Sequence, residues 1–158
     1  MANTYSQISI QVVFAVKGRE NIIATNFRDR LHEYISGIIT GNKQKPLAVN
    51  GWKDHVHTFF GMEPSLSISD LVRDIKSGSS KWINDHGFTK RKFHWQEGFG
   101  AFSYSKSQRN SVIPYIMKQE EHHRRKTFRE EYLGMLQKAE IDFDEKYLIS
   151  ATARRDGS

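Results

Sequence analysis

The chain has 158 residues, no cysteine and a formal net charge of +6. A chain of this length can bury one substantial core, so one domain over residues 1–150 is the simplest expectation. The lack of cysteine excludes disulfides and thiolate metal sites, so imidazole, carboxylate or amide groups must bind any metal ion. The basic excess favours a polyanionic partner, and an aromatic content of 12% is typical of proteins that stack on unpaired bases.

The composition also bears on where the protein acts. No stretch approaches the roughly 18 consecutive apolar residues that span a bilayer. The first residues, MANTYSQISIQ, have neither a basic start nor an apolar signal core. We therefore expect a cytoplasmic protein with no membrane partner, and a disordered tail over residues 151–158.

Strands and helices alternate along the predicted domain. Segments rich in β-branched and aromatic residues predict strands, and apolar residues at helical spacing predict helices. The expected elements are, in chain order, a strand over 6–16, a helix over about 26–39, strands over 47–49 and 52–62, a helix over 67–87, a strand over 97–105, and helices over 108–125 and 128–138. This order predicts an α+β, ferredoxin-like split β-α-β fold. Its antiparallel sheet has the main helices on one face, the other face is left uncovered, and an added C-terminal helix carries a tyrosine.

Small residues mark three of the expected boundaries. Asn50-Gly51 predicts a two-residue hairpin turn. Ser67, followed three residues later by Asp70, resembles a capping box with Asp in place of Glu. Gly78 lies inside the helix that Ser67 begins and indicates a bend or a close approach to another element.

The stretch DHVHTFF places His55 and His57 two residues apart in a predicted strand. Residues at this spacing point to the same side of a sheet, so both imidazoles can reach one metal ion, with Asp54 nearby to orient them. The alternative is that two polar residues simply alternate with core residues such as Val56. Spacing does not decide between these interpretations, and two ligands are too few for a metal site.

A second motif lies in the helix that contains VIPYIMKQEEHHRRK. At about 100° per residue, Gln119 and His122 lie within about 40° of Tyr115, and Lys126 also falls close. A phenol beside a bound metal ion can attack a phosphodiester and form a covalent aryl phosphate that a hydroxyl later displaces. The alternative for Tyr115 is ordinary packing on an amphipathic helix, which is the expected role of Tyr132.

Taken together, these motifs resemble the single-tyrosine HUH transposases of bacterial insertion sequences, the IS200-like family, and the related REP-associated tyrosine transposases. The resemblance extends from about Ser6 to Leu148. It rests on the stretches DHVHTFF, SLSISDLVRDIKSGSSKWI, WQEGFGAFSYSKSQ and YIMKQEEHHRRKTFREEY, which occur in that order.

The resemblance implies roles for four residues. His55 and His57 match the family's metal ligands, Gln119 matches the amide that completes the site, and Tyr115 matches the nucleophile. The implied activity is cleavage and rejoining of single-stranded DNA through a 5′-phosphotyrosine intermediate, with Mg²⁺ or Mn²⁺ as cofactor. The implied partners are DNA with hairpin elements and a second copy of the chain in a homodimer, in a bacterial protein that is associated with the nucleoid when bound to DNA.

Basic and polar residues outside this set are candidates for DNA contact, although an ordinary solvated surface is an equally good interpretation for several of them. The candidates are Arg73, Lys76, His122, Arg124, Arg125 and Lys126. The remaining histidines, His32, His86, His94 and His123, are expected to be solvated.

Three other functions stay open at this point. A nickase for replication or plasmid transfer would use similar chemistry, but the small size and single tyrosine argue against it. A non-catalytic RNA- or DNA-binding module of the same fold would need neither a metal nor Tyr115. A domesticated transposase that binds DNA without moving it would have the same sequence features.

Overall fold

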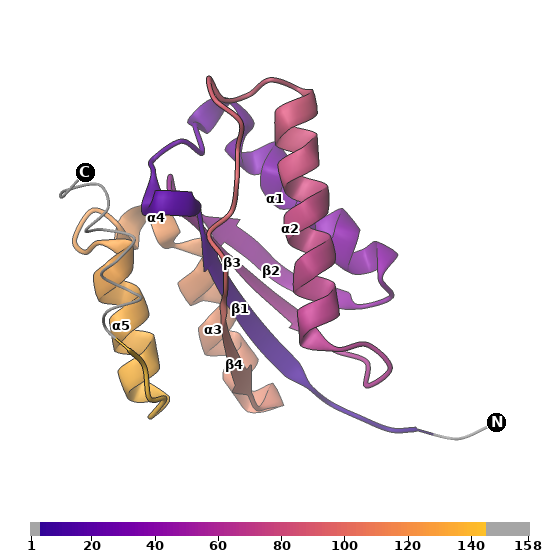
Figure 1. The fold of residues 1–158 in the computed structure, drawn as a ribbon. Coiled ribbons are helices and arrows are strands. Elements are labelled where there is room, and N and C mark those ends of the chain that lie inside the picture. Colours follow the sequence, from indigo (N-terminus) through magenta and orange to yellow (C-terminus); the bar gives the residue numbers. More distant parts are fainter. Residues whose placement is uncertain (1–3, 145–158) are drawn as a thin grey trace.

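The computed structural model describes residues 4–144, so the tail expected at 151–158 lies outside the described residues. A four-stranded antiparallel sheet of order β2-β3-β1-β4 forms the middle layer (Figure 1). Its strands are β1 (Ser9–Ala15), β2 (Lys45–Gly51), β3 (His55–Gly61) and β4 (Gly100–Tyr104). The helices are α1 (Thr25–Gly41), α2 (Ile68–Asp85), α3 (Arg109–Met117), α4 (Gln119–His122) and α5 (Phe128–Lys138), with 3₁₀ turns η1 (Lys17–Arg19) and η2 (Lys106–Gln108). Within residues 4–144, no helix has the length and apolar character needed to cross a membrane.

The ferredoxin-like fold class is confirmed by this strand order and by the helices that follow β1 and β3. Both α1 and α2 lie on one face of the sheet (Figure 1). Alternate residues of β1, such as Val12 and Phe14, join Val56 and Phe60 of β3 in the core beneath these helices. The expected close approach at Gly78 is also present, because a Cβ there would lie 2.9 Å from Ile38 Cδ1 of α1.

The second face of the sheet is covered, and the prediction that it would be uncovered is wrong. The C-terminal helices α3, α4 and α5 lie across it (Figure 1). The physical reason is that this face is itself apolar and must be kept from water. Two clusters fill the space beneath the helices, and their buried members are Val13, Ala15, Phe102, Phe128 and Leu136 in one and Ala48, Phe59, Val112 and Ile116 in the other.

The turn between β2 and β3 also differs from the prediction. Asn50 and Gly51 lie inside β2, and residues 52–54 make the turn instead. Gly51 is required by a close approach, since a Cβ there would lie 2.2 Å from the carbonyl oxygen of His55. The Asn50 amide donates to the carbonyl of Ile116, 3.0 Å away, and so fixes α3 against β2.

The helix predicted over 108–125 is broken into separate parts. It begins with η2, continues as α3, and stops at Lys118, whose φ of −103° and ψ of 29° depart from helical values. The imidazole Nε2 of His122 donates to the carbonyl oxygen of Tyr115, 3.1 Å away, which satisfies an acceptor that the break exposes. The chain then re-enters a helix at Gln119.

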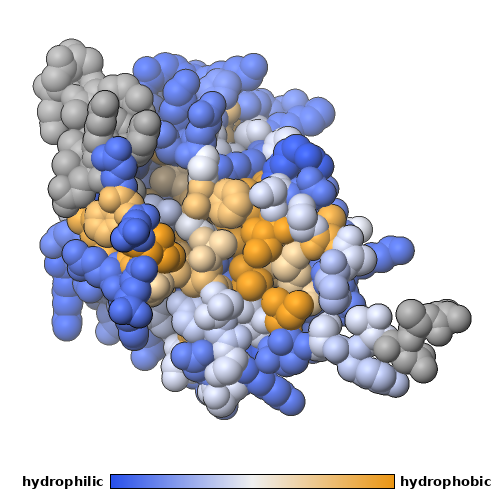
Figure 2. Space-filling model, turned by 60° about the horizontal axis from the view of Figure 1, so that its bottom comes forward, coloured by the Kyte–Doolittle hydropathy of each residue, from blue (hydrophilic) through white to orange (hydrophobic). Residues whose placement is uncertain are grey.

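The face that lies at the bottom in Figure 1 is apolar at its centre. Figure 2 shows apolar side chains gathered in the middle of this face and polar side chains around its margin.

His32 of α1 is buried, with 6% of its surface exposed, so the expectation that it would be solvated is wrong. Its Nε2 has no hydrogen-bond partner among the residues that the structure describes. Burial lowers the pKa of His32 from 6.5 to about 4. The neutral ring is therefore favoured in the folded chain.

The burial of His32 predicts a loss of stability in mild acid. Below pH 6.5 the unfolded chain binds a proton that the folded chain rejects, so the free energy of unfolding should fall by about 3 kcal/mol between pH 6.5 and pH 4. His32→Leu should remove this part of the slope in urea unfolding curves, whereas His94→Leu, at an exposed position, should keep it. Parallel slopes for wild type and His32→Leu would contradict the assignment.

Candidate catalytic and metal site

The two motif histidines lie at the beginning of β3 and point away from α1 and α2, as their spacing predicts. Both are fully buried. His55 pairs with Ala15 and His57 with Val13 across the β1–β3 register, so both sit at the upper end of the sheet. Their ring centroids are 5.1 Å apart. The strand therefore presents two imidazoles side by side to the helices that cover this face.

The Nδ1 atoms of both rings are held by hydrogen bonds. His55 Nδ1 lies 2.8 Å from Asp54 Oδ1, and His57 Nδ1 lies 2.8 Å from the Nε2 of Gln11, a buried residue of β1. Tyr104 donates its hydroxyl to Gln11 Oε1, 3.1 Å away, so β4 supports the same contact. These bonds orient both rings so that their Nε2 atoms point toward α4 and α5. Asp54 accepts from His55 Nδ1, as the outer partner of a metal-binding histidine commonly does. The Gln11 amide nitrogen instead donates to His57 Nδ1, so in this arrangement the ring proton of His57 lies on Nε2 and must leave before that atom binds a metal ion.

Tyr115 lies in α3, above the histidine pair. Its hydroxyl donates a hydrogen bond to Glu131 Oε2, and its ring stacks on His122 with centroids 4.4 Å apart. Burial, together with the neighbouring carboxylate, raises the pKa of Tyr115 above its ordinary value of 10. The phenol is therefore protonated at neutral pH in this arrangement.

Gln119, the expected third ligand, is fully buried at the start of α4. Its Oε1 lies 2.8 Å from His55 Nε2, and its Nε2 donates to Glu131 Oε2, 3.2 Å away. The break at Lys118 separates Gln119 from the helix of Tyr115. The structure nevertheless brings both residues to the histidine pair.

Glu131 of α5 is a central member of the site that the sequence interpretation did not identify. Its Oε1 lies 3.1 Å from His57 Nε2 and 3.5 Å from His55 Nε2. Burial would raise the pKa of this carboxyl group, but hydrogen bonds from His123 and His57 and the nearby His55 lower it well below its usual range. Glu131 is thus ionised, and its two oxygens connect the imidazoles with the phenol of Tyr115.

A signal for Glu131 is present in the sequence. Phe128, Tyr132 and Leu136 follow one face of α5 at spacings of four residues, and Glu131 lies on the same face, three residues after Phe128. The residue is 3% exposed. A glutamate within an apolar stripe must be paired when buried, so its position indicates a partner across the interface.

His123 is also part of the site, and the expectation that it would be solvated is wrong. Its side chain is 3% exposed. The Nε2 atom lies 3.1 Å from both Gln119 Oε1 and Glu131 Oε1, and the ring lies 4.6 Å from that of His55. The chain reverses direction after α4, which turns His123 inward.

The atoms that converge here fit a divalent cation. One nitrogen each from His55 and His57 and one oxygen of Glu131 lie within 4.8 Å of one another. With a proton on Nδ1 shared with Asp54, the lone pair on His55 Nε2 faces Gln119 Oε1, also an acceptor, at 2.8 Å. Facing acceptors repel unless a proton or a cation lies between them. The set of imidazole, carboxylate and amide groups suits Mg²⁺, Mn²⁺ and several transition metals.

The other residues that the sequence singled out divide between two locations. Arg124, Arg125 and Lys126 are exposed and line a hollow of about 490 Å³ together with Asp54 and His123. Arg73 and Lys76 belong to α2, on the opposite side of the sheet from Tyr115, and the structure does not bring them to the site.

Arg73 and Lys76 already have partners within the chain. Arg73 pairs with Asp70 at 3.1 Å. The ammonium of Lys76 donates to the carbonyls of Gln96 and Gly98 at 2.8 and 2.6 Å. Lys76 therefore holds the segment that leads into β4.

A larger groove of about 920 Å³ opens beside Tyr115. Residues of β4, α3 and α5 line it, and Tyr115, Glu131 and Lys126 lie along it. Tyr115 is half-buried at its wall, so the phenol is accessible from solvent. Tyr104 and Phe102 of β4 supply aromatic surface within it.

The chain is similar to known proteins in both sequence and structure. The model of the family described as IS200-like transposase matches residues 4–119. Among solved structures, a candidate transposase from Deinococcus radiodurans R1 is 21% identical with a TM-score of 0.62, over 75% of this chain and 95% of the other. A REP-associated tyrosine transposase bound to a REP hairpin is 15% identical with a TM-score of 0.57, over 78% of this chain and 73% of the other. No curated protein sequence matches.

Proposed function

The chain belongs to the family of IS200-like transposases, and from that premise we propose that it cleaves and rejoins single-stranded DNA through a covalent bond to Tyr115. One observation carries the proposal. The Tyr115 hydroxyl is hydrogen-bonded to Glu131, and the other oxygen of that carboxylate contacts His57 Nε2 at 3.1 Å. A nucleophile, a proton acceptor and a candidate metal site thus share one buried carboxylate.

Tyr115 is the proposed nucleophile. Its oxygen forms a bond to the phosphorus of the scissile phosphodiester while the bond from phosphorus to the 3′-oxygen breaks, and the leaving oxygen takes up a proton. The product is a 5′-phosphotyrosine and a free 3′-hydroxyl. Attack by a 3′-hydroxyl on the phosphotyrosine reverses these changes, restores the phenol and joins the strands without ATP.

Glu131 positions the phenol and receives its proton at Oε2. The hydroxyl of Tyr115 donates to that oxygen in the structure. Proton acceptors must lie within hydrogen-bond reach of the proton they remove, and Glu131 meets that condition. Gln119 Nε2 donates to the same oxygen and keeps the carboxylate turned toward Tyr115.

His55, His57, Gln119 and Glu131 are the proposed ligands of Mg²⁺ or Mn²⁺. A divalent cation bound by them would neutralise charge on the phosphate oxygens and orient the in-line attack. Asp54 and Gln11 fix the orientation of the two imidazole rings through hydrogen bonds to their Nδ1 atoms. Burial lowers the pKa of His57, although Glu131 opposes the shift, so the ring is readily neutral, as ligation requires.

The proposed substrate is single-stranded DNA that carries hairpin elements, and the REP-associated tyrosine transposase of similar fold is bound to a REP hairpin. The groove beside Tyr115 would receive unpaired nucleotides on the partly exposed ring of Tyr104. Arg124, Arg125 and Lys126 would contact phosphates near the metal ligands. His122, stacked on the nucleophile, would keep the phenol oriented.

All proposed catalytic groups come from one chain. Tyr115, His55 and Glu131 meet within the described residues, so the chemistry needs no side chain from a second copy. The homodimer stays a prediction, and sedimentation of the protein with and without DNA would test it.

The experiment that tests the proposal is covalent trapping. The protein is incubated with labelled single-stranded DNA from its own genomic flanks, in Mn²⁺ or in EDTA, and separated by denaturing electrophoresis. We expect a protein–DNA adduct in Mn²⁺, its loss in EDTA, and a phosphorylated peptide that contains Tyr115. Binding without an adduct on every flank tested would favour a non-catalytic or domesticated DNA-binding protein.

A further inference from the structure

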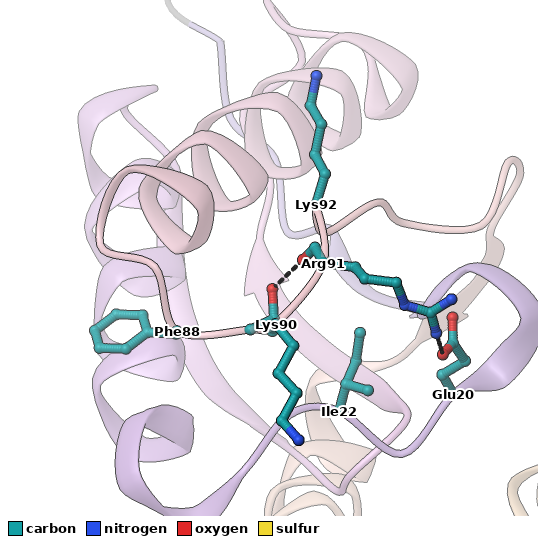
Figure 3. A pocket seen from close by; sticks show the side chains of 7 residues that line it. Glu20, Ile22, Phe88, Lys90, Arg91 and Lys92 are labelled. Atoms are coloured by element: carbon teal, nitrogen blue, oxygen red, sulfur yellow. Dashed lines mark hydrogen bonds and ion pairs between the residues drawn. The ribbon is translucent and has the colours of Figure 1, made fainter.

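A basic segment that the catalytic site does not use lies in the loop after α2. Lys90, Arg91 and Lys92 are consecutive and exposed. Together with Thr89, Phe88 and two residues that follow η1, they line a cavity of about 430 Å³ (Figure 3). Three cations within one short loop form a concentrated patch of positive charge, and this patch has no role in the chemistry described above.

The loop is held in place at both ends. Phe88 stacks on Phe27 of α1, with centroids 4.8 Å apart and rings nearly parallel at 2°. At the other end, the Asn84 amide donates to the carbonyl of Phe93 at 3.1 Å and accepts from its N–H at 2.7 Å. The patch is therefore preorganised, and a partner would not have to order it on binding.

Arg91 and the two lysines differ in how they are used. Arg91 pairs with Glu20 at 2.7 Å, which ties the loop to the segment after η1. Lys90 and Lys92 extend from the loop in different directions (Figure 3). Within residues 4–144, neither lysine has an ion-pair partner. Their ammonium groups are thus available to an external anion.

The loop lies at the same end of the sheet as the catalytic site. Trp95 forms a bridge with Val16, the residue after β1, and Ala15 of β1 pairs with His55. The segment 19–22 lies between two cavities. Its residues Glu20 and Ile22 line the cavity at the loop. Arg19 and Asn21 line the hollow beside the metal ligands.

From this placement we propose that Lys90 and Lys92 bind backbone phosphates of the double-helical stem of the substrate, while its unpaired strand occupies the groove at Tyr115. The inference rests on the proposed function and extends it to a second contact surface. It assigns the loop a duplex because the patch has no free aromatic face. The ring of Phe88 stacks on Phe27 and also on His86, with the centroids of Phe88 and His86 5.2 Å apart.

The chemistry of the patch distinguishes a stem from a single strand. Proteins that hold single strands combine cations with aromatic rings on which bases stack. The loop has cations but no such ring. Its lysines would therefore contact the phosphates of the DNA and not the base edges, which carry the sequence. The contact should therefore be independent of sequence and sensitive to salt.

The test is a comparison of two DNA probes with the double variant Lys90→Gln/Lys92→Gln. One probe is a hairpin with a stem of about one helical turn and an unpaired flank, and the other is the flank alone. Binding is measured by fluorescence anisotropy over a series of salt concentrations. We expect the hairpin to bind about tenfold more weakly near 0.1 M salt, with a salt slope smaller by about 2, and the flank alone to bind as it does to wild type.

A matched control removes two charges elsewhere. Lys43→Gln/Lys45→Gln alters two exposed lysines at the α1–β2 connection and should leave both probes unaffected. Equal weakening of hairpin and flank by Lys90→Gln/Lys92→Gln would overturn the assignment to a stem, and unchanged hairpin binding would overturn the contact itself. Adduct formation on the flank should stay at the wild-type level in both double variants. If the proposed covalent chemistry is wrong, wild type itself forms no adduct, and this failure is distinct from a failure of the stem contact.

Discussion

Tyr115→Phe is expected to abolish the covalent protein–DNA adduct and to lower strand cleavage by at least about 10⁴-fold. The substitution removes one oxygen, the atom that attacks phosphorus, and keeps the ring that stacks on His122 at 4.4 Å. DNA binding should change little, because the groove keeps its shape. The measurement is single-turnover cleavage of labelled DNA, with binding followed in parallel by anisotropy.

Tyr132→Phe is the matched control for this variant. Tyr132 is also partly buried and stacks on Phe128 at 5.4 Å, and it packs in the cluster beneath α5 as the sequence predicts. The same oxygen is removed, so cleavage and adduct formation should stay close to wild type. An adduct that persists in Tyr115→Phe would contradict the assignment and direct the search to another nucleophile.

The part of the site that lies on β3 could be predicted because a strand has a fixed period of two. That period places His55 and His57 on one side and Val56 on the other, and the structure agrees. The fixed period of the α-helix made α5 predictable in the same way. The bounds predicted for α5 are those observed, since apolar residues repeat along one face and Thr127 caps the first turn.

The remainder depended on contacts between distant segments. An unbroken helix would separate Gln119 from Tyr115 by about 40°. The break at Lys118, which the contact of His122 with the Tyr115 carbonyl spans, has no signal in the local pattern. Asn50-Gly51 has the composition of a tight turn, but Asn50 bonds to α3 and Gly51 lies close to the backbone of β3. Glu131 is 76 positions from His55, and only the folding of α5 over the second face brings them together.

The covering of that second face connects the fold to the chemistry. An uncovered face would leave the imidazoles hydrated, with the phenol and the carboxylate on separate surfaces. The C-terminal helices exclude water from His55 and His57, which strengthens each electrostatic contact that they make. They leave Tyr115 half-buried at the wall of the groove, where a phosphodiester can reach it.

Glu131→Gln is expected to weaken Mn²⁺ binding and to lower cleavage by about 100-fold even when Mn²⁺ is saturating. The substitution removes the negative charge that faces His57 and His55, so the cation loses a ligand. It also replaces the carboxylate that accepts the Tyr115 hydrogen bond with a neutral amide, which is a far poorer proton acceptor. Calorimetric titration with Mn²⁺ measures the first effect, and single-turnover cleavage at saturating Mn²⁺ measures the second.

Glu130→Gln makes the same chemical change one residue away. Glu130 is exposed and accepts hydrogen bonds from Thr127 at the helix cap, which a glutamine oxygen can also do, so metal binding and cleavage should stay at the wild-type level. The two roles of Glu131 then separate cleanly. Full recovery of Glu131→Gln at high Mn²⁺ would restrict Glu131 to metal binding, because a residue that also takes the proton of Tyr115 cannot be replaced by more metal. A rate defect that persists at saturation, together with a weakened Mn²⁺ titration, would place both functions on the one carboxylate that joins the histidines to the tyrosine.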